Sequence, residues 1–356
     1  MQPSRFAALR FQAALCGARV AGYQPAATKE PTIHEPTRLT AWALTTGEAG
    51  MRTQARGLAC AVADEVVEKV TPVRRPWRWG WSGWQMRLGL AAHADALSPP
   101  WPDLVVSSGR RSALLARQVG RMSGGRTALV HVQDPRTGWA DFDLIIAMEH
   151  DLVDGPNVVR VATALHDVTP ERLAAAGAAW KARLSALPRP LVGVILGGPA
   201  GSASPFGAAE ARRLLGELRI LRGVIGAGLA VVPSRRTPDE ALAVFAEAAD
   251  HDPGVWVWRR EGDNPYLGVL AQADRLVVTG DSVSMVSEAL ATSHPVEVFI
   301  GRLRDRHRGF LANLKSRRLI RVFDGRWMEP SPRAPVDATG EAAQAVREML
   351  ARRARA

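Results

Sequence analysis

The sequence lacks several features that would assign the chain directly to a class of protein: a disulfide framework, a metal site, a membrane-spanning helix and the motifs of a short-chain dehydrogenase. Its 356 residues include two cysteines, Cys16 and Cys60, which give neither a disulfide framework nor the spacing of a metal site. No apolar run reaches the ~18 residues of a membrane-spanning helix. The first expected strand is not followed by Gly-x-Gly-x-x-Gly, and the chain has no Tyr-x-x-x-Lys, so a short-chain-dehydrogenase type of epimerase is disfavoured. These absences favour a metal-independent protein of a reduced, cytoplasmic compartment.

Lysine is also scarce, so the positive charge of the chain is carried by arginine. The 46 basic residues outnumber the 35 acidic ones and give a formal net charge of +11. Such a charge favours anionic partners, and arginine suits the bidentate contacts that phosphate groups make. The basic stretch 301–321 is read as a solvated face, as a nucleic-acid surface, or as a patch for an anionic membrane or a lipid-linked acceptor. It has no recognition motif or interleaved aromatic residues, so nucleic acid is not an expected partner.

Short strands that are apolar on both faces alternate with helices from residue 38 onward. This pattern is typical of parallel sheets covered by helices on both faces. It predicts an α/β chain with two doubly wound, Rossmann-like domains that face a cleft, where ligands bind at the carboxyl ends of the strands. The first series of strands is expected at 39–45, 103–109, 127–133, 142–148 and 157–163, with a helix at 50–66, and the second series at 191–198, 228–234, 254–258, 275–280 and 295–300.

Four segments follow from this division. The stretch 1–36 has no acidic residue before Glu30 and is read as a poorly ordered extension: a transit peptide, a basic surface helix, or the product of a misassigned start codon. An N-terminal domain is expected at 37–187 and a C-terminal domain at 188–325, and the tail 326–356 is expected to end in a helix that crosses back to the first domain. The segment 77–84 contains four tryptophans and is read as a packed aromatic cluster or as a loop for a membrane interface or an acceptor.

Polar and glycine-rich loops follow the strands of the second series. The stretch "GDSVSMVSEAL" (280–290) turns from a strand into a helix expected to begin near Val283, which places Ser284 and Glu288 on one helix face. Each polar group also has a structural reading: a helix cap, a tight turn, or a glutamate paired with an arginine. Together they favour a nucleotide-binding site, in which glycines approach a diphosphate, arginines clamp it and Glu288 accepts hydrogen bonds from a ribose diol. The expected donor-binding residues are Gly197, Gly198, Ser234, Arg235, Arg236, Asp281, Ser282, Ser284, Met285 and Glu288.

Transfer of a sugar from a nucleotide requires a base that deprotonates the acceptor hydroxyl. Asp134 follows a strand of the first series and is the preferred candidate, although an aspartate before Pro135 is also a common turn residue. The other candidates are His131, Glu149, His150, Asp151 and His166.

Several long motifs resemble the bacterial relatives of the plant "elongated mitochondria" fission factor. They include "LVVSSGRRSA", "HVQDPR", "FDLIIAMEHD", "ALHDVTPERL", "PSRRTP" and "GDSVSMVSEA", and the resemblance runs from about Leu39 to Phe323. Many members of this family are labelled as predicted nucleoside-diphosphate-sugar epimerases. The plant member is implicated in organelle fission and in the recruitment of a dynamin-like protein.

A more distant resemblance is to GT-B glycosyltransferases, especially the transferase that adds N-acetylglucosamine to the lipid-linked peptidoglycan precursor. This resemblance implies that Glu288 binds the ribose. It also implies that Gly198, Ser282, Ser284 and Met285 lie near the diphosphate. The loops "GEAG", "SSGRRSA" and "HVQDP" then stand on the acceptor side, although the first has Met51 near the place of a common histidine. The expected acceptor-side residues are Gly47, Gly50, Gly109, Arg110, Arg111 and Gln133.

The sequence therefore predicts a metal-independent, GT-B-like glycosyltransferase that takes a nucleotide-diphosphate sugar as substrate and needs no cofactor. An envelope saccharide or lipid is the expected acceptor, and a peripheral position on the inner membrane accompanies the cytoplasmic location. Two alternatives stay open: a non-catalytic scaffold at a membrane surface, and a nucleotide-sugar 2-epimerase of the GT-B type.

Overall fold

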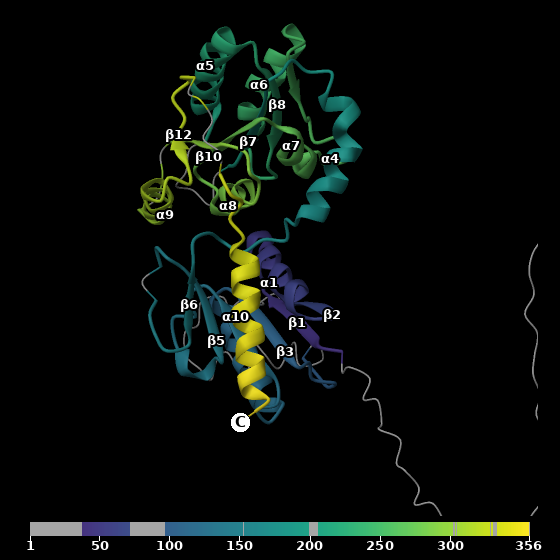
Figure 1. The fold of residues 1–356 in the computed structure, drawn as a ribbon, viewed down its shortest axis with the longest axis vertical. Helices are drawn as coiled ribbons and strands as arrows, with labels where there is room; N and C mark the ends of the chain where they lie inside the picture. Colours follow the sequence, from purple (N-terminus) through teal and green to yellow (C-terminus); the bar gives the residue numbers. More distant parts are fainter. Residues whose placement is uncertain are drawn as a thin grey trace, which may run out of the picture. The chain divides into compact units, whose positions relative to one another are not determined.

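Two six-stranded parallel sheets organise the chain (Figure 1). The computed structural model describes residues 38–71, 97–151, 153–198, 206–301, 303, 305–327, 329 and 333–355. The predicted extension 1–36, the tryptophan-rich segment 77–84 and the segment 199–205 lie outside the described residues.

The first sheet has the strand order β2-β1-β3-β4-β5-β6, and every neighbouring pair is parallel. Its strands are β1 (Thr40–Thr45), β2 (Glu65–Val70), β3 (Leu104–Ser108), β4 (Ala128–Val132), β5 (Leu144–Met148) and β6 (Val158–Val161). Helices α1 (Ala49–Val62) and α10 (Ala338–Arg353) supply apolar residues to the core on one face, and α3 (Arg110–Met122) does so on the other. This covering of both faces explains why β3, β4 and β5 are buried along their whole length.

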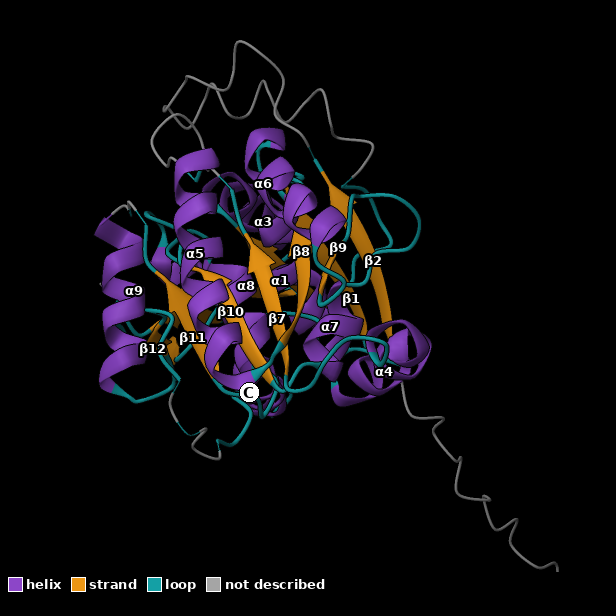
Figure 2. Cartoon of the chain, turned by 90° about the horizontal axis from the view of Figure 1, so that it is seen from above, coloured by secondary structure: helices purple, strands orange, loops and turns teal. Residues whose placement is uncertain are grey.

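The second sheet has the order β12-β11-β10-β7-β8-β9, again with parallel pairs throughout. Its strands are β7 (Leu191–Leu196), β8 (Gly228–Pro233), β9 (Val255–Val257), β10 (Arg275–Thr279), β11 (Val296–Phe299) and β12 (Arg321–Val322). One face is covered by α4 (Pro170–Leu184), α7 (Tyr266–Gln272), α8 (Val283–Leu290) and α9 (Asp305–Ser316), and the other by α5 (Ala208–Ile225) and α6 (Asp239–His251) (Figure 2). The predicted fold class, α/β with two Rossmann-like parallel sheets, is confirmed.

One predicted helix is wrong in its last four residues. The helix expected at 50–66 ends at Val62, and Glu65–Val70 forms the edge strand β2. The reason is visible in the sequence "EVVEKV", where exposed and partly buried residues alternate as they do along a strand with one solvated face. The small apolar residues at the end of α1 keep the helical spacing up to the start of this strand, so the change from a helical to a two-residue period is hard to see in the sequence.

Helix α4 packs on the second sheet although it was expected in the N-terminal domain, and the tail helix α10 packs on the first sheet, the position expected from the sequence. Helix α4 was expected within 37–187, but it lies on α7, and Leu184 belongs to the core of the second sheet. Gly268 of α7 allows this close approach, because a Cβ there would lie 2.5 Å from Trp180 of α4. Helix α10 packs on α1, and its Thr339 hydroxyl exchanges hydrogen bonds of 3.0 and 2.9 Å with the backbone of His166.

None of the helices within the described residues is long and apolar enough to cross a membrane.

Candidate functional site

Three loops meet at the carboxyl ends of the central strands of the second sheet. They are the Gly197–Gly198 turn after β7, the segment 234–237 after β8, and the turn at Asp281 after β10. A Cβ on Gly197 would overlap the Asp281 carboxylate, and one on Gly198 would overlap the carbonyl oxygen of Arg236. Only glycine fits these two positions, so the predicted donor-side glycines hold the three loops in contact.

Hydroxyl groups fix the backbone of the same loops. Thr279, the last residue of β10, accepts a hydrogen bond of 2.7 Å from the Gly197 amide. The Thr237 hydroxyl lies 2.9 Å from the carbonyl oxygen of Leu196 and 3.1 Å from the Ser234 hydroxyl. Neither threonine is among the predicted donor-binding residues; the sequence offers Thr237 only as a possible helix cap. The side chains of Arg235 and Arg236 are exposed beside these loops.

Asp281 is buried between the loops, with 6% of its surface exposed. Neither of its carboxylate oxygens meets a well-aligned donor among the described residues. Burial raises the pKa of Asp281, while the Thr279 hydroxyl, the Gly198 amide and the charge of Arg236 act in the opposite direction. A buried carboxylate therefore lies at the place where the sequence predicts a bound diphosphate.

Helix α8 begins at Val283, as predicted. Its N-cap is Ser282, whose hydroxyl accepts a long hydrogen bond of 3.5 Å from the Met285 amide. This is the structural role that the sequence offered for Ser282 beside diphosphate binding. One turn later, the Ser287 hydroxyl accepts a hydrogen bond of 3.0 Å from the Ala164 amide, which fixes α8 to the segment after β6.

Glu288 pairs with a tyrosine. Its Oε2 accepts a hydrogen bond of 2.5 Å from the hydroxyl of Tyr266, the first residue of α7. Burial raises the pKa of Glu288 to about 7; the Asp167 charge also raises it, and the Tyr266 hydrogen bond and Arg172 lower it. The predicted alternative, a glutamate paired with an arginine, does not describe this side chain, because Arg172 pairs with Asp167 at 2.6 Å.

The predicted acceptor-side loops meet each other at the carboxyl ends of the first sheet. Gly47 and Gly109 have φ values of 104° and 91°, which favour glycine, and a Cβ on Gly109 would overlap Met51 of α1. The Gln133 side chain follows β4 and donates a long hydrogen bond of 3.4 Å to Gln54 of α1. Arg110 and Arg111 are the first two residues of α3.

The predicted acceptor-side and donor-side residues contact each other at Gly50 and Ser284. A Cβ on Gly50, in the first turn of α1, would lie 3.2 Å from the Ser284 hydroxyl in the first turn of α8. The N-termini of these two helices therefore lie against each other. Residues that the sequence predicts on opposite sides of one site are thus brought together.

Four of the six predicted bases, Asp134, His131, Glu149 and Asp151, are engaged in other contacts. In contrast, neither ring nitrogen of the buried His166, nor the Nε2 of His150, has a hydrogen-bond partner among the described residues. Asp134 accepts a hydrogen bond of 2.7 Å from the Arg136 amide and pairs with the Arg136 side chain at 3.2 Å, which is the geometry of a turn aspartate. Burial lowers the pKa of His131 to about 3, and this neutral ring lies 2.8 Å from the Ser107 hydroxyl. Glu149 and Asp151 pair with Arg317 and Arg306 of the basic stretch at 2.7 and 3.2 Å.

In the part of the chain that the structure describes, no three His, Cys, Asp or Glu side chains are grouped as they are around a metal ion. Two cations of the stretch 301–321 also form ion pairs with residues after β5, so the stretch is not a uniform positive face.

A family model described as mitochondrial fission ELM1 matches residues 49–350. The chain belongs to this family. The mitochondrial fission protein ELM1 of Arabidopsis thaliana is 30% identical over 282 residues, which cover 71% of this chain and 65% of the plant protein. The uncharacterized protein RP120 of Rickettsia prowazekii (strain Madrid E) is 24% identical over 259 residues, 63% of this chain and 72% of that protein. The predicted family resemblance is confirmed.

A solved structure has the same fold as this ELM1-family chain. The UDP-GlcNAc 2-epimerase of Methanocaldococcus jannaschii superposes with a TM-score of 0.52 at 11% identity, covering 87% of this chain and 99% of the epimerase. This likeness shows the shared arrangement of two Rossmann-like domains.

Proposed function

We propose that this chain binds a nucleotide-diphosphate sugar at the three loops of the second sheet and acts as a GT-B-like glycosyltransferase. The observation that supports it is the position of Glu288: a carboxyl group held by Tyr266, one turn into a helix that starts where three glycine- and hydroxyl-rich loops meet. An oriented carboxylate accepts the two hydrogen bonds of a ribose diol, and the free N–H groups of the α8 N-terminus suit a diphosphate.

In this proposal Arg235 and Arg236 bind the diphosphate from the loop after β8. They are exposed and adjacent to the Gly198 turn, and their charge compensates the leaving group without a metal ion. The acceptor enters from Gly47, Gly50 and the start of α3. Asp134 remains the proposed base and has to exchange its contact with Arg136 for the acceptor hydroxyl.

A scaffold function is the second candidate, because one observation favours it. The Asp281 carboxylate is buried against Gly197, and its ionised form repels a diphosphate. In a scaffold these loops would only connect strands and helices. A 2-epimerase shares the nucleotide site of the transferase and differs from it in needing no acceptor.

Nucleotide binding separates the enzyme from the scaffold. In a thermal-shift series with UDP, GDP, CDP, ADP and their sugars, we expect one nucleotide to stabilise the chain by about 2.7 kcal/mol at ~100 times its dissociation constant. Glu288→Ala should abolish that shift. Glu217→Ala is the matched control, since Glu217 is another partly buried carboxyl with a raised pKa, on α5 away from the loops. A folded chain that no nucleotide stabilises would exclude the proposal and leave the scaffold.

The affinity for the nucleotide should rise with pH through neutrality. Glu288 has a pKa of about 7, so below pH 7 it is mostly protonated and must lose a proton before it can accept two hydrogen bonds. Each pH unit below 7 should weaken binding by up to about tenfold. The affinity at each pH is measured by calorimetry in an Asp281→Asn background. This background is needed because Asp281 ionises as the pH rises, and its negative charge then lowers the affinity for the diphosphate. Glu288→Gln should remove the slope, and an unchanged slope would assign it to another group.

A further inference from the structure

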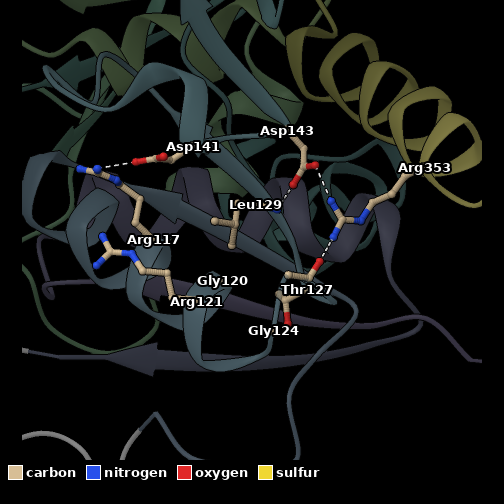
Figure 3. A pocket seen from close by; sticks show the side chains of 10 residues that line it. Arg117, Gly120, Arg121, Gly124, Thr127, Leu129, Asp141, Asp143 and Arg353 are labelled. Carbon is tan, nitrogen blue, oxygen red and sulfur yellow. Dashed lines mark hydrogen bonds and ion pairs between the residues drawn. The ribbon is translucent and has the colours of Figure 1, made fainter. Parts of the chain in front are cut away.

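A separate hollow of about 460 Å³ opens at the amino-terminal edge of the first sheet (Figure 3). It lies between the end of α3, the starts of β4 and β5, and the end of α10. The proposed nucleotide site lies at the carboxyl ends of the strands of the other sheet, so the two sites share no residue. The lining consists of Arg117, Gly120, Arg121, Gly124, Gly125, Thr127, Leu129, Asp141, Asp143 and Arg353.

The two acidic residues of this hollow are already neutralised. Asp143 accepts a hydrogen bond of 2.7 Å from the Leu129 amide and pairs with Arg353 at 2.6 Å, so both of its oxygens are engaged. Asp141 pairs with Arg117. Three arginines face two carboxylates, and a positive charge is left over in the lining.

That charge is on Arg121, which lies four residues after Arg117 on α3, so the two side chains share a helix face. No described residue pairs with the Arg121 guanidinium, and Figure 3 shows it on the same side of the hollow as Arg117, with no interaction drawn. The Nε of Arg117 is buried and has no hydrogen-bond acceptor among the described residues. Gly138 leaves room for this guanidinium, because a Cβ at Gly138 would overlap it.

We propose that this hollow binds a phosphate monoester, with its oxygens between the guanidinium groups of Arg121 and Arg117, whose side chain is 20% exposed. A phosphate has enough acceptor oxygens to reach both groups while the Arg117–Asp141 pair stays intact. Leu129 and Gly120 provide an apolar surface on which the remainder of the ligand lies. The same chemistry belongs to a soluble phosphate ester and to a phosphorylated lipid headgroup.

The test compares Arg121→Gln with Arg126→Gln in the full chain. Arg126 is exposed five residues further along, outside the lining, so both variants lose the same charge at neighbouring positions. Glycerol 3-phosphate is titrated by calorimetry at constant ionic strength and without any nucleotide, because the terminal phosphate of a nucleotide would compete for the hollow. The difference between the two variants assigns the binding to the hollow. Vesicles of phosphatidylcholine with and without phosphatidic acid form the second arm.

We expect saturable binding at one site per chain. Arg121→Gln should weaken it about tenfold, the loss of a charge-assisted hydrogen bond, and Arg126→Gln less than about twofold. Binding confined to glycerol 3-phosphate identifies a soluble ester, and binding confined to phosphatidic acid identifies a headgroup. Equal losses in the two variants would show attraction by net charge only and overturn the proposal, as would the absence of binding in both arms. If the thermal-shift series shows that UDP does not bind to the chain, the conclusion about phosphate binding in the hollow is unaffected.

Discussion

Replacing Glu297 by alanine is expected to lower the free energy of unfolding by about 3–5 kcal/mol. Glu297 of β11 pairs with Arg275 of β10 at 3.0 Å, and each side chain exposes 5% of its surface or less. Trp327 covers the Arg275 guanidinium at 4.4 Å from its ring centre. Removal of the Glu297 carboxylate leaves the positive charge of Arg275 buried inside the second sheet. The free-energy cost of that burial exceeds the contribution of the ion pair to stability. Urea denaturation at pH 7 measures the loss.

An exposed ion pair provides the comparison for this variant. Asp305 and Arg308 form a pair whose side chains are 95% and 64% exposed, so Asp305→Ala should change the stability by less than about 1 kcal/mol. The double replacement Arg275→Met with Glu297→Leu should recover most of the stability lost in Glu297→Ala. A loss below about 1 kcal/mol in Glu297→Ala would mean that water reaches Arg275.

Gly198→Ala should weaken nucleotide binding by roughly a hundredfold, the order expected when a binding group is displaced by about 1 Å. The added methyl group would overlap the carbonyl oxygen of Arg236, so the loops after β7 and β8 have to separate. The strain should also lower the free energy of unfolding by about 1–3 kcal/mol. Calorimetric titration with the nucleotide selected by thermal shift measures the first effect, and urea denaturation the second.

Gly216 is the matched control for this substitution. It lies on α5, and a Cβ there would meet no atom within 4 Å. Gly216→Ala should stabilise the chain by about 0.5–1 kcal/mol, because alanine has the higher helix propensity, and should leave binding unchanged. If Gly198→Ala binds the nucleotide as well as the parent chain, the ligand does not depend on the contact between these loops.

The sequence predicted those parts of the fold that local pattern determines. The parallel strands are apolar on both faces, which a reader of the sequence sees directly, and the start of α8 at Val283 follows from its cap residue. Strand β2 was missed because an edge strand buries one face weakly, and Val67 is 41% exposed. Its two-residue period extends over only six residues.

The partners of the candidate site residues depend on contacts between distant segments, which local pattern does not encode. Tyr266 reaches Glu288 from a helix 22 residues away, and the Ala164 amide reaches Ser287 across 123 residues. The hollow between α3 and α10 requires Arg353 to meet Asp143 across 210 residues. The raised pKa of Glu288 likewise comes from burial, which needs the packed structure. The sequence thus indicated which residues carry polar chemistry, but not what each of them contacts.

The packing of α10 on the first sheet also constrains how the chain folds during synthesis. Ala338, Ala342 and Val346 of α10 complete the same core as Leu58 of α1 and Val106 of β3. A ribosome makes the first sheet early and α10 only after the whole second sheet has been made. Until α10 is made, α1 alone covers this face of the first sheet, so part of the face stays exposed while the second sheet folds. Chaperones that bind exposed apolar surface have their longest opportunity there.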